Sequence, residues 1–235
     1  ETLTPTATLA PTRVSPTAVP TPTVFAPQRG GDFREGRATD AISFHPYQTT
    51  DASSRLYQDY VFASGLWLRD PQTLQPMPGM AETWTVSNEG KTYAFALRRD
   101  LKWSDGTPLT AQDFVWTFEQ ANKPENKYPY AEGLNNIASY IAKDDYTLEI
   151  TLKEATCIAL TSVDAITPLP KHVWSKLDWN DPAKNPEIRL PSVVSGPYKV
   201  KEWQRGDHIT FVRNELYYRG APYFDSYTIH IVPDP

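Results

Sequence analysis

Residues 81–118 decide the fold and read AETWTVSNEGKTYAFALRRDLKWSDGTPLTAQDFVWTF. Within them, residues 92–97 alternate bulky apolar with smaller side chains at a period of two, which predicts a strand with one buried face. Residues 104–107 predict a tight turn, because Asp105 can hydrogen-bond to its own backbone and Gly106 can adopt a positive φ.

A helix is predicted directly after this turn. Thr110 takes the N-cap position, and Asp113, three residues later, completes a capping box. The following apolar residues have the spacing i, i+3, i+4, i+7 and form one helical face, namely Ala111, Phe114, Val115 and Phe118. The sequence Asn122-Lys123-Pro124 predicts the end of the helix.

The motifs of this stretch resemble the signature of the family 5 extracellular solute-binding proteins, the oligopeptide- and dipeptide-type receptors of ABC importers. The resemblance is carried by residues 81–84 (AETW), 92–98 (TYAFALR) and 102–115 (KWSDGTPLTAQDFV). Two further motifs match in order, residues 194–200 (VSGPYKV) and residues 214–222 (NELYYRGAP). The resemblance covers residues 30–235, which correspond to about the first half of a family member.

The resemblance implies an α/β fold of the three-lobed, type II periplasmic-binding-protein class. We expect a Thr/Pro-rich stalk at residues 1–29, lobe I with a mixed sheet at residues 30–66 and 167–235, and a smaller inserted lobe II at residues 67–166. The C-terminal lobe of the family is missing. We therefore expect the isolated chain to expose an apolar cleft surface, to be marginally stable and to bind no solute tightly.

Length and composition restrict the class of protein. The chain has 235 residues, a net charge of −5 and a pI near 5.4, which argues against nucleic acid as a partner. One cysteine, Cys157, excludes an intrachain disulfide and a multi-cysteine metal site, and free cysteine is typical of the interior, so we expect it to be buried. No apolar run approaches the roughly 20 residues that span a bilayer.

The first 27 residues contain eight threonines and six prolines, with only Glu1 and Arg13 charged. This composition predicts an extended linker, and the alternative is a plain disordered terminus. Relatives in bacteria without a closed periplasm are lipoproteins held by such a segment, so we expect an extracytoplasmic, lipid-tethered protein. The lipidated cysteine itself would precede Glu1.

Further elements follow from periodicity. Asp51 or Ser53 can cap a helix that ends near Gly65, with the face Tyr57, Tyr60, Val61 and Ser64. A second helix is predicted from the spacing of Leu134, Ile137, Ala138 and Ile141. Strands are predicted at residues 146–152, 198–203, 209–211 and 227–231.

No catalytic or metal-binding constellation is present in the sequence. The histidines have no metal-ligand spacing and are predicted to be surface or hairpin residues, namely His45, His172, His208 and His230. The signature tryptophans Trp84, Trp103 and Trp116 are predicted to be core residues rather than cleft residues. We therefore expect neither an enzyme nor a bound cofactor or metal.

The resemblance implies that the chain captures a peptide between lobes and delivers it to an ABC permease, as a monomer. The family's Leu-Asp-Pro segment reads Phe44-His45-Pro46 here. The implied ligand contacts are Thr50, Asp51, Ala52, Ser53, Ser195 and Gly196. The alternatives are another solute (an oligosaccharide, a nickel complex or haem), or a surface sensor or adhesin without transport.

Overall fold

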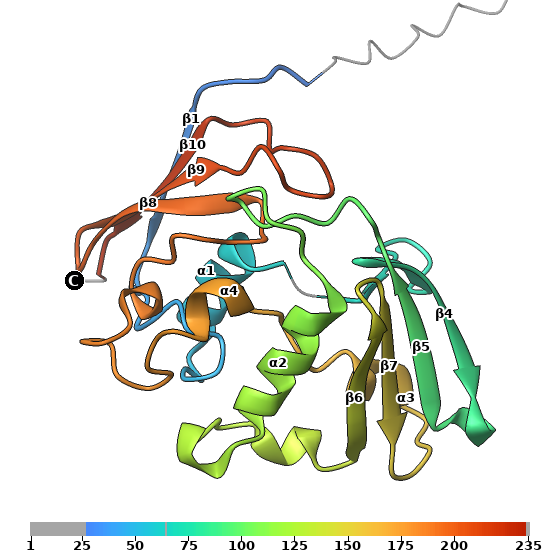
Figure 1. The fold of residues 1–235 in the computed structure, drawn as a ribbon. Coiled ribbons are helices and arrows are strands. Elements are labelled where there is room, and N and C mark those ends of the chain that lie inside the picture. The colour runs from blue at the N-terminus through green and yellow to red at the C-terminus, as the bar shows by residue number, and fades with distance from the viewer. Residues whose placement is uncertain (1–26, 64, 234–235) are drawn as a thin grey trace, which may run out of the picture.

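The computed structural model describes residues 27–63 and 65–233, so most of the predicted stalk and Ser64 lie outside the described residues. Figure 1 shows two four-stranded sheets side by side, with helix α2 between them. The strands of the second sheet all lie in residues 81–152, between the first strand of the first sheet and its last three. This insertion is the organisation that the family resemblance implies, while the lobe boundaries at residues 66/67 and 166/167 stay predictions.

The first sheet is mixed, as expected. Strand β1 (Asp32–Arg37) pairs in parallel with β10 (Ser226–Ile231), and β9 (His208–Arg213) and β8 (Tyr198–Gln204) follow as antiparallel neighbours. Helix α1 (Ala52–Val61) packs on this sheet, where the Tyr60 ring lies 5.8 Å from Phe211 and 5.4 Å from Tyr227. Asp51 caps α1 by accepting the N–H of Ser54 at 2.7 Å, so one of the two predicted caps is confirmed.

The second sheet has the order β4 (Ala81–Ser87), β5 (Thr92–Leu97), β7 (Thr147–Leu152), β6 (Ile137–Asp144), and every neighbouring pair is antiparallel. Helix α2 (Ala111–Ala121) packs on β6 and β7 through the apolar face that the sequence predicts. The strand at residues 92–97, the capping box of Thr110 and Asp113, and the strand over 146–152 are confirmed.

The helix predicted from Leu134, Ile137, Ala138 and Ile141 is wrong, because Leu134 ends a short 3₁₀ turn and the other three residues lie in strand β6. Strand β6 pairs with β7 through two register shifts, which interrupt the regular alternation of its side chains. Its apolar spacing therefore imitates a helix, and the pairing with β7 decides its conformation.

The remaining elements are short connections. Strands β2 and β3 form a separate antiparallel pair, and the described residues also contain two short helices and four 3₁₀ turns. Their bounds are β2 Trp67–Arg69, β3 Pro76–Pro78, α3 Ala159–Val163, α4 Lys171–Trp174, η1 Asn88–Gly90, η2 Pro124–Asn126, η3 Ala131–Leu134 and η4 Pro186–Ile188.

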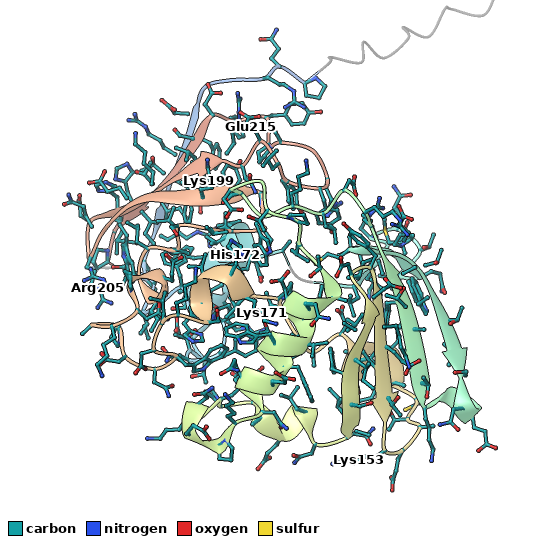
Figure 2. The ribbon with its side chains drawn as sticks, viewed as in Figure 1. Lys153, Lys171, His172, Lys199, Arg205 and Glu215 are labelled. Atoms are coloured by element: carbon teal, nitrogen blue, oxygen red, sulfur yellow. The ribbon has the colours of Figure 1, made fainter. Side chains whose placement is uncertain are left out.

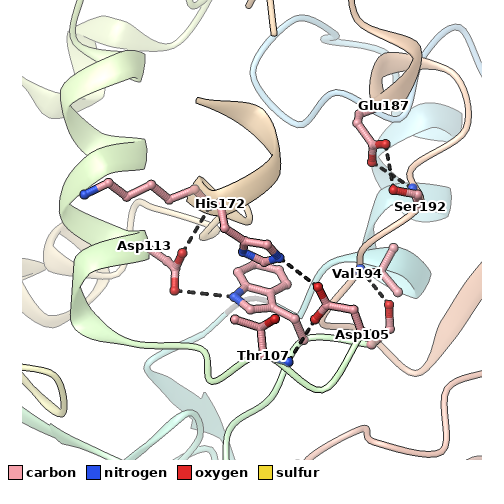
Figure 3. Close-up of polar contacts among 10 residues, drawn as sticks. Asp105, Thr107, Asp113, His172, Glu187, Ser192 and Val194 are labelled. Atoms are coloured by element: carbon pink, nitrogen blue, oxygen red, sulfur yellow. Dashed lines mark hydrogen bonds and ion pairs between the residues drawn. The ribbon is translucent and has the colours of Figure 1, made fainter. Parts of the chain in front are cut away.

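Asp113 joins the signature helix to the segment that returns to the first sheet. One carboxylate oxygen accepts the Thr110 N–H at 2.9 Å and the indole N–H of Trp103 at 3.4 Å, and the other accepts the Lys171 N–H at 3.1 Å. Figure 3 shows the last two of these contacts at Asp113. Burial raises the pKa of Asp113, and these hydrogen bonds lower it in part. One buried carboxylate thus closes the capping box and holds the start of α4.

The signature turn makes a second set of contacts with the returning segment. Asp105 Oδ2 lies 2.8 Å from His172 Nε2 (Figure 3). Ser104 donates its N–H to the carbonyl of Val194 at 2.8 Å, and its hydroxyl accepts the Val194 N–H at 3.1 Å. Burial opposes ionisation of Asp105, but hydrogen bonds from Thr107 and His172 keep its pKa below the usual value.

Two single-residue predictions are wrong. His45 is fully buried, where its ring lies 4.8 Å from Trp174 and 4.7 Å from Trp179, both edge-on. Cys157 is exposed, because it lies in the irregular segment after β7 rather than in a packed element. Of the three signature tryptophans, Trp103 is fully buried, while Trp84 and Trp116 are partly buried and pack against the core.

Candidate functional site in the groove beside helix α1

A groove runs between helix α1 and the loop that precedes strand β6. Two adjoining hollows, of about 70 and 450 Å³, share Arg55, Tyr128 and Ala165 in their walls. The smaller one is also lined by α1 and by the segment before it, and the larger one by Tyr130, Gly133 and Leu134. The groove therefore lies between elements packed on the first sheet and elements packed on the second.

The base of the groove is held by buried polar contacts. The hydroxyl of Tyr47 donates to the carbonyl of Thr167 at 2.7 Å, and burial raises the pKa of Tyr47. The side-chain amide of Gln58 is buried and donates to the carbonyl of Ser43 at 3.0 Å and to the Thr49 hydroxyl at 2.8 Å. Satisfied buried groups of this kind fix side-chain positions.

The rim of the groove combines aromatic rings with one charge of each sign. The guanidinium carbon of Arg55 lies 5.8 Å from the centre of the Tyr130 ring, and the rings of Tyr128 and Tyr130 meet edge-on at 6.0 Å. Asp59 follows Arg55 by one helical turn; desolvation in the groove raises its pKa and Arg55 lowers it, although the side chain remains accessible to solvent. The rim thus offers a cation, a carboxylate and aromatic faces to a ligand.

The four predicted ligand residues around the start of α1 lie together. Thr50 and Ala52 are exposed, and Asp51 and Ser53 are half-buried. Asp51 Oδ1 accepts the Ser54 N–H, whereas Asp51 Oδ2 is buried and has no hydrogen-bond partner among the described residues. This oxygen is buried rather than open to a ligand, and none of residues 50–53 lines either hollow of the groove.

Ser195 and Gly196 lie at the other end of α1. The Ser195 hydroxyl accepts the Ala63 N–H at 2.9 Å, and Gly196 donates its N–H to the carbonyl of Val61 at 2.7 Å. A Cβ at Gly196 would come within 2.6 Å of the Val61 carbonyl carbon. Both residues are buried and hold the C-terminal end of α1, and the structure does not bring them together with residues 50–53.

Most of the groove residues were missed by the sequence reasoning. Arg55 and Asp59 have the i, i+4 spacing of neighbours on a helix surface, which was a usable signal once the helix was assigned. Tyr128-Pro129-Tyr130 is a second signal, because proline favours a turn or loop and tyrosine offers a ligand both an apolar ring and a hydroxyl group. No pattern in the sequence links residues 55–59 with residues 128–134 or 165–167.

The described residues contain no group of three or more histidine, cysteine, aspartate or glutamate side chains that could hold a metal ion. Within the same residues, no helix has both the length and the apolar character needed to cross a membrane.

Residues 75–235, more than half of the chain, match the family described as bacterial extracellular solute-binding proteins, family 5. The chain belongs to this family. One family 5 relative, the oligopeptide-binding protein AppA of Bacillus subtilis (strain 168), is 27% identical over 209 residues, which cover 88% of this chain and 38% of AppA. The periplasmic oligopeptide-binding protein OppA of Escherichia coli (strain K12) is 34% identical over 167 residues, which cover 62% of this chain and 29% of OppA.

The fold agrees with family 5. The solved structure of Bacillus subtilis AppA in complex with a nonapeptide is similar with a TM-score of 0.80 and 28% identity, over 89% of this chain and 41% of that one. The expected class, a periplasmic-binding-protein-like α/β fold, is thereby confirmed. The chain spans less than half of the length of each of these relatives.

Proposed function

We propose that this chain contributes the first two lobes of a solute-binding receptor for an ABC importer, and that the solute is a peptide held in the groove beside α1. The observation that carries the proposal is the position of Arg55, Tyr128 and Ala165, which line both hollows between the two sheets. A site bounded by two lobes is typical of receptors that close over a ligand.

The groove has the groups that a peptide requires. Arg55 can pair with a carboxylate, and the rings of Tyr128 and Tyr130 offer apolar faces that tolerate many side chains. We place residues 50–53 at the edge of the site, because they line neither hollow and Thr50 and Ala52 are exposed at the start of α1, just before Arg55. We propose no ligand contact for Ser195 and Gly196. They support α1, because their polar contacts are with the C-terminal end of that helix.

Delivery of the solute to a permease, an extracytoplasmic location, a lipid tether and a monomeric state are parts of the same proposal. The extracytoplasmic location is supported by the family and by the similarity to the periplasmic oligopeptide-binding protein OppA. The net charge of −5 is consistent with a partner other than nucleic acid.

Saturation-transfer NMR on the 235-residue chain tests the proposal, because it detects weak binding at millimolar ligand concentrations. The ligands are trialanine and maltotriose at equal millimolar concentration. We expect transfer to trialanine, and a weakening of about fivefold, or roughly 1 kcal/mol, on Arg55→Gln or Tyr130→Ala. Lys153→Gln, on the exposed end of the second sheet (Figure 2), is the matched control and leaves the signal unchanged.

Two outcomes would contradict the proposal. Saturation transfer to maltotriose but not to trialanine would indicate that the solute is a sugar and not a peptide. Transfer to trialanine that is equal in Arg55→Gln, Tyr130→Ala and the wild type would place the ligand outside this groove.

A further inference from the structure

A second groove lies on the first sheet's side of the molecule and shares no lining residue with the candidate site. It consists of two adjoining hollows, of about 580 and 460 Å³, which share Pro182 and Arg189. The first is closed by Ile42 and Arg205, and the second by Leu190, Lys201 and Trp203. Figure 2 shows Arg205 at the edge of the molecule away from the second sheet.

Trp203 organises the cations of this groove. The guanidinium carbon of Arg205 lies 4.8 Å from the centre of the Trp203 ring, and that of Arg189 lies 5.7 Å from it. The indole N–H of Trp203 donates to Asp40 at 2.9 Å, and Arg205 donates to the carbonyl of Ile42 at 3.1 Å. The ring and both guanidinium groups are therefore positioned before any partner arrives.

The charges of the groove are unbalanced. Among the described residues, no carboxylate lies within 4.0 Å of the cationic nitrogens of Arg189, Arg205 or Lys201. Glu202, the acidic residue of the lining, lies 3.7 Å from His208. The oxygens of Asp40 accept hydrogen bonds from Trp203 and from the Gly206 N–H. A cluster of unpaired cations in a chain of net charge −5 favours an anionic partner.

The groove also has an apolar component. Ile42 is 60% exposed and Leu190 is 46% exposed, and they flank the cations together with Pro182. Both hollows are wide and continuous, which suits an extended chain better than a compact small molecule. A guanidinium fork binds a carboxylate in a planar, bidentate way, and the apolar residues suit aliphatic side chains between the carboxylates.

We propose that this groove binds an extended acidic segment of a partner protein, with its carboxylates on Arg189 and Arg205 and its apolar side chains against Ile42 and Leu190. The cations lie in a concave surface, which disfavours a flat lipid bilayer. The negative net charge disfavours nucleic acid. The inference does not depend on the proposed solute, since the two grooves are separate.

The test is fluorescence anisotropy with a labelled peptide of alternating Asp or Glu and Leu or Pro, blocked at both ends. Its matched analogue replaces each Asp and Glu by Asn and Gln. We expect the full chain to bind the acidic peptide about tenfold more tightly than the analogue, and the double variant R189Q/R205Q to lose about tenfold. The double variant K102Q/K153Q removes the same charge from exposed lysines elsewhere and binds within about twofold of the wild type.

Five outcomes would overturn the proposal. An equal loss in K102Q/K153Q would mean that net charge, not the groove, attracts the peptide. A loss in Arg55→Gln with none in R189Q/R205Q would assign the peptide to the candidate solute site. Binding to vesicles of phosphatidylserine without binding to the peptide would identify a lipid surface, and a dimer that R189Q/R205Q dissociates would identify a second copy of the chain. Absence of any binding to the acidic peptide would leave the groove without its proposed partner.

Discussion

The Asp164 carboxylate accepts the backbone N–H of Leu66 across 2.7 Å, and this contact joins the two segments through which the chain passes between the sheets. Leu66 directly precedes β2, and Asp164 follows α3, so the residues are 98 positions apart in the sequence. Burial raises the pKa of Asp164 to about 7, although hydrogen bonds from Leu66 and Trp67 lower it in part. The junction of the lobes therefore contains a carboxyl group that titrates near neutral pH.

Asp164 predicts a defined pH dependence of stability. Its folded-state pKa of about 7 lies above the ordinary value of 3.8, so the stability that Asp164 contributes is complete below pH 3.8 and is lost as pH rises through 7. Asp164→Asn keeps an acceptor for Leu66 and cannot ionise. We expect the variant to match the wild type near pH 4 and to exceed it at pH 8 by up to roughly 4 kcal/mol in the free energy of unfolding. Urea unfolding at both pH values measures this, and a difference that is independent of pH would contradict it.

The burial of His45 predicts that stability changes with pH in the opposite direction. Burial lowers its pKa to about 3, with partial opposition from the hydrogen bond to the carbonyl of Trp179. Nε2 lies 3.1 Å from that carbonyl, and Nδ1 accepts the Tyr47 N–H at 3.1 Å, which together require the neutral ring with its proton on Nε2. The proton that makes the ring a cation binds more tightly to the unfolded chain. The stability that the neutral His45 contributes is therefore present above pH 6.5 and is lost as pH falls toward 3.

Ring NMR of the histidines checks this prediction directly. At pH 5 the His45 ring should be neutral, whereas His208, whose pKa is raised by the hydrogen bond that it donates to Asp207, should be protonated. A His45 signal that titrates together with that of His208 would contradict the buried position.

Gly196 is predicted to be intolerant of any side chain. A Cβ there would lie 2.6 Å from the Val61 carbonyl carbon and 2.7 Å from the Tyr60 oxygen, so α1 would have to move. We expect Gly196→Ala to lower the free energy of unfolding by about 2 kcal/mol, as overpacking does. Gly133→Ala is the control, because no atom lies within 4 Å of its added Cβ, and it should change stability by less than about 0.5 kcal/mol. Equal stability of the two variants would contradict the packing of Gly196 on α1.

Asp113 is predicted to stabilise both lobes at once. Asp113→Ala removes the acceptor of Thr110, Trp103 and Lys171, and leaves three donors of buried or half-buried hydrogen bonds without a partner. The expected loss is about 2–3 kcal/mol in thermal or urea unfolding. Asp100 is exposed and its side chain has no hydrogen bond within the described residues, so Asp100→Ala supplies the comparison. A loss no larger than that of Asp100→Ala would show that the contact is not stabilising.

Local features of the fold could be predicted from the sequence. The capping box of Thr110 and Asp113 and the strand at residues 92–97 depend on neighbours within a few residues, so propensity and periodicity identify them. The helix assigned over residues 134–141 shows the limit, because pairing with β7 overrides the spacing of its apolar residues.

Features that depend on distant contacts could not be predicted. His45 is enclosed by Trp174 and Trp179, more than 120 positions later, and nothing in the segment around Phe44-His45-Pro46 indicates this enclosure. The candidate site shows the same limit. The family resemblance indicates the start of α1, but its pairing with Tyr128 and Ala165 exists only once the lobes are assembled.

Mapping of trialanine on the ¹⁵N-labelled chain by amide chemical shifts tests the central claim most directly. We expect shifts at residues 50–59 and 128–134 that grow with millimolar peptide and that need about fivefold more peptide in Arg55→Gln. We expect no change at Arg189 or Arg205, because the second groove is separate. Shifts confined to residues outside the groove beside α1, or no shifts at all, would contradict the assignment of this groove as the site where the solute binds.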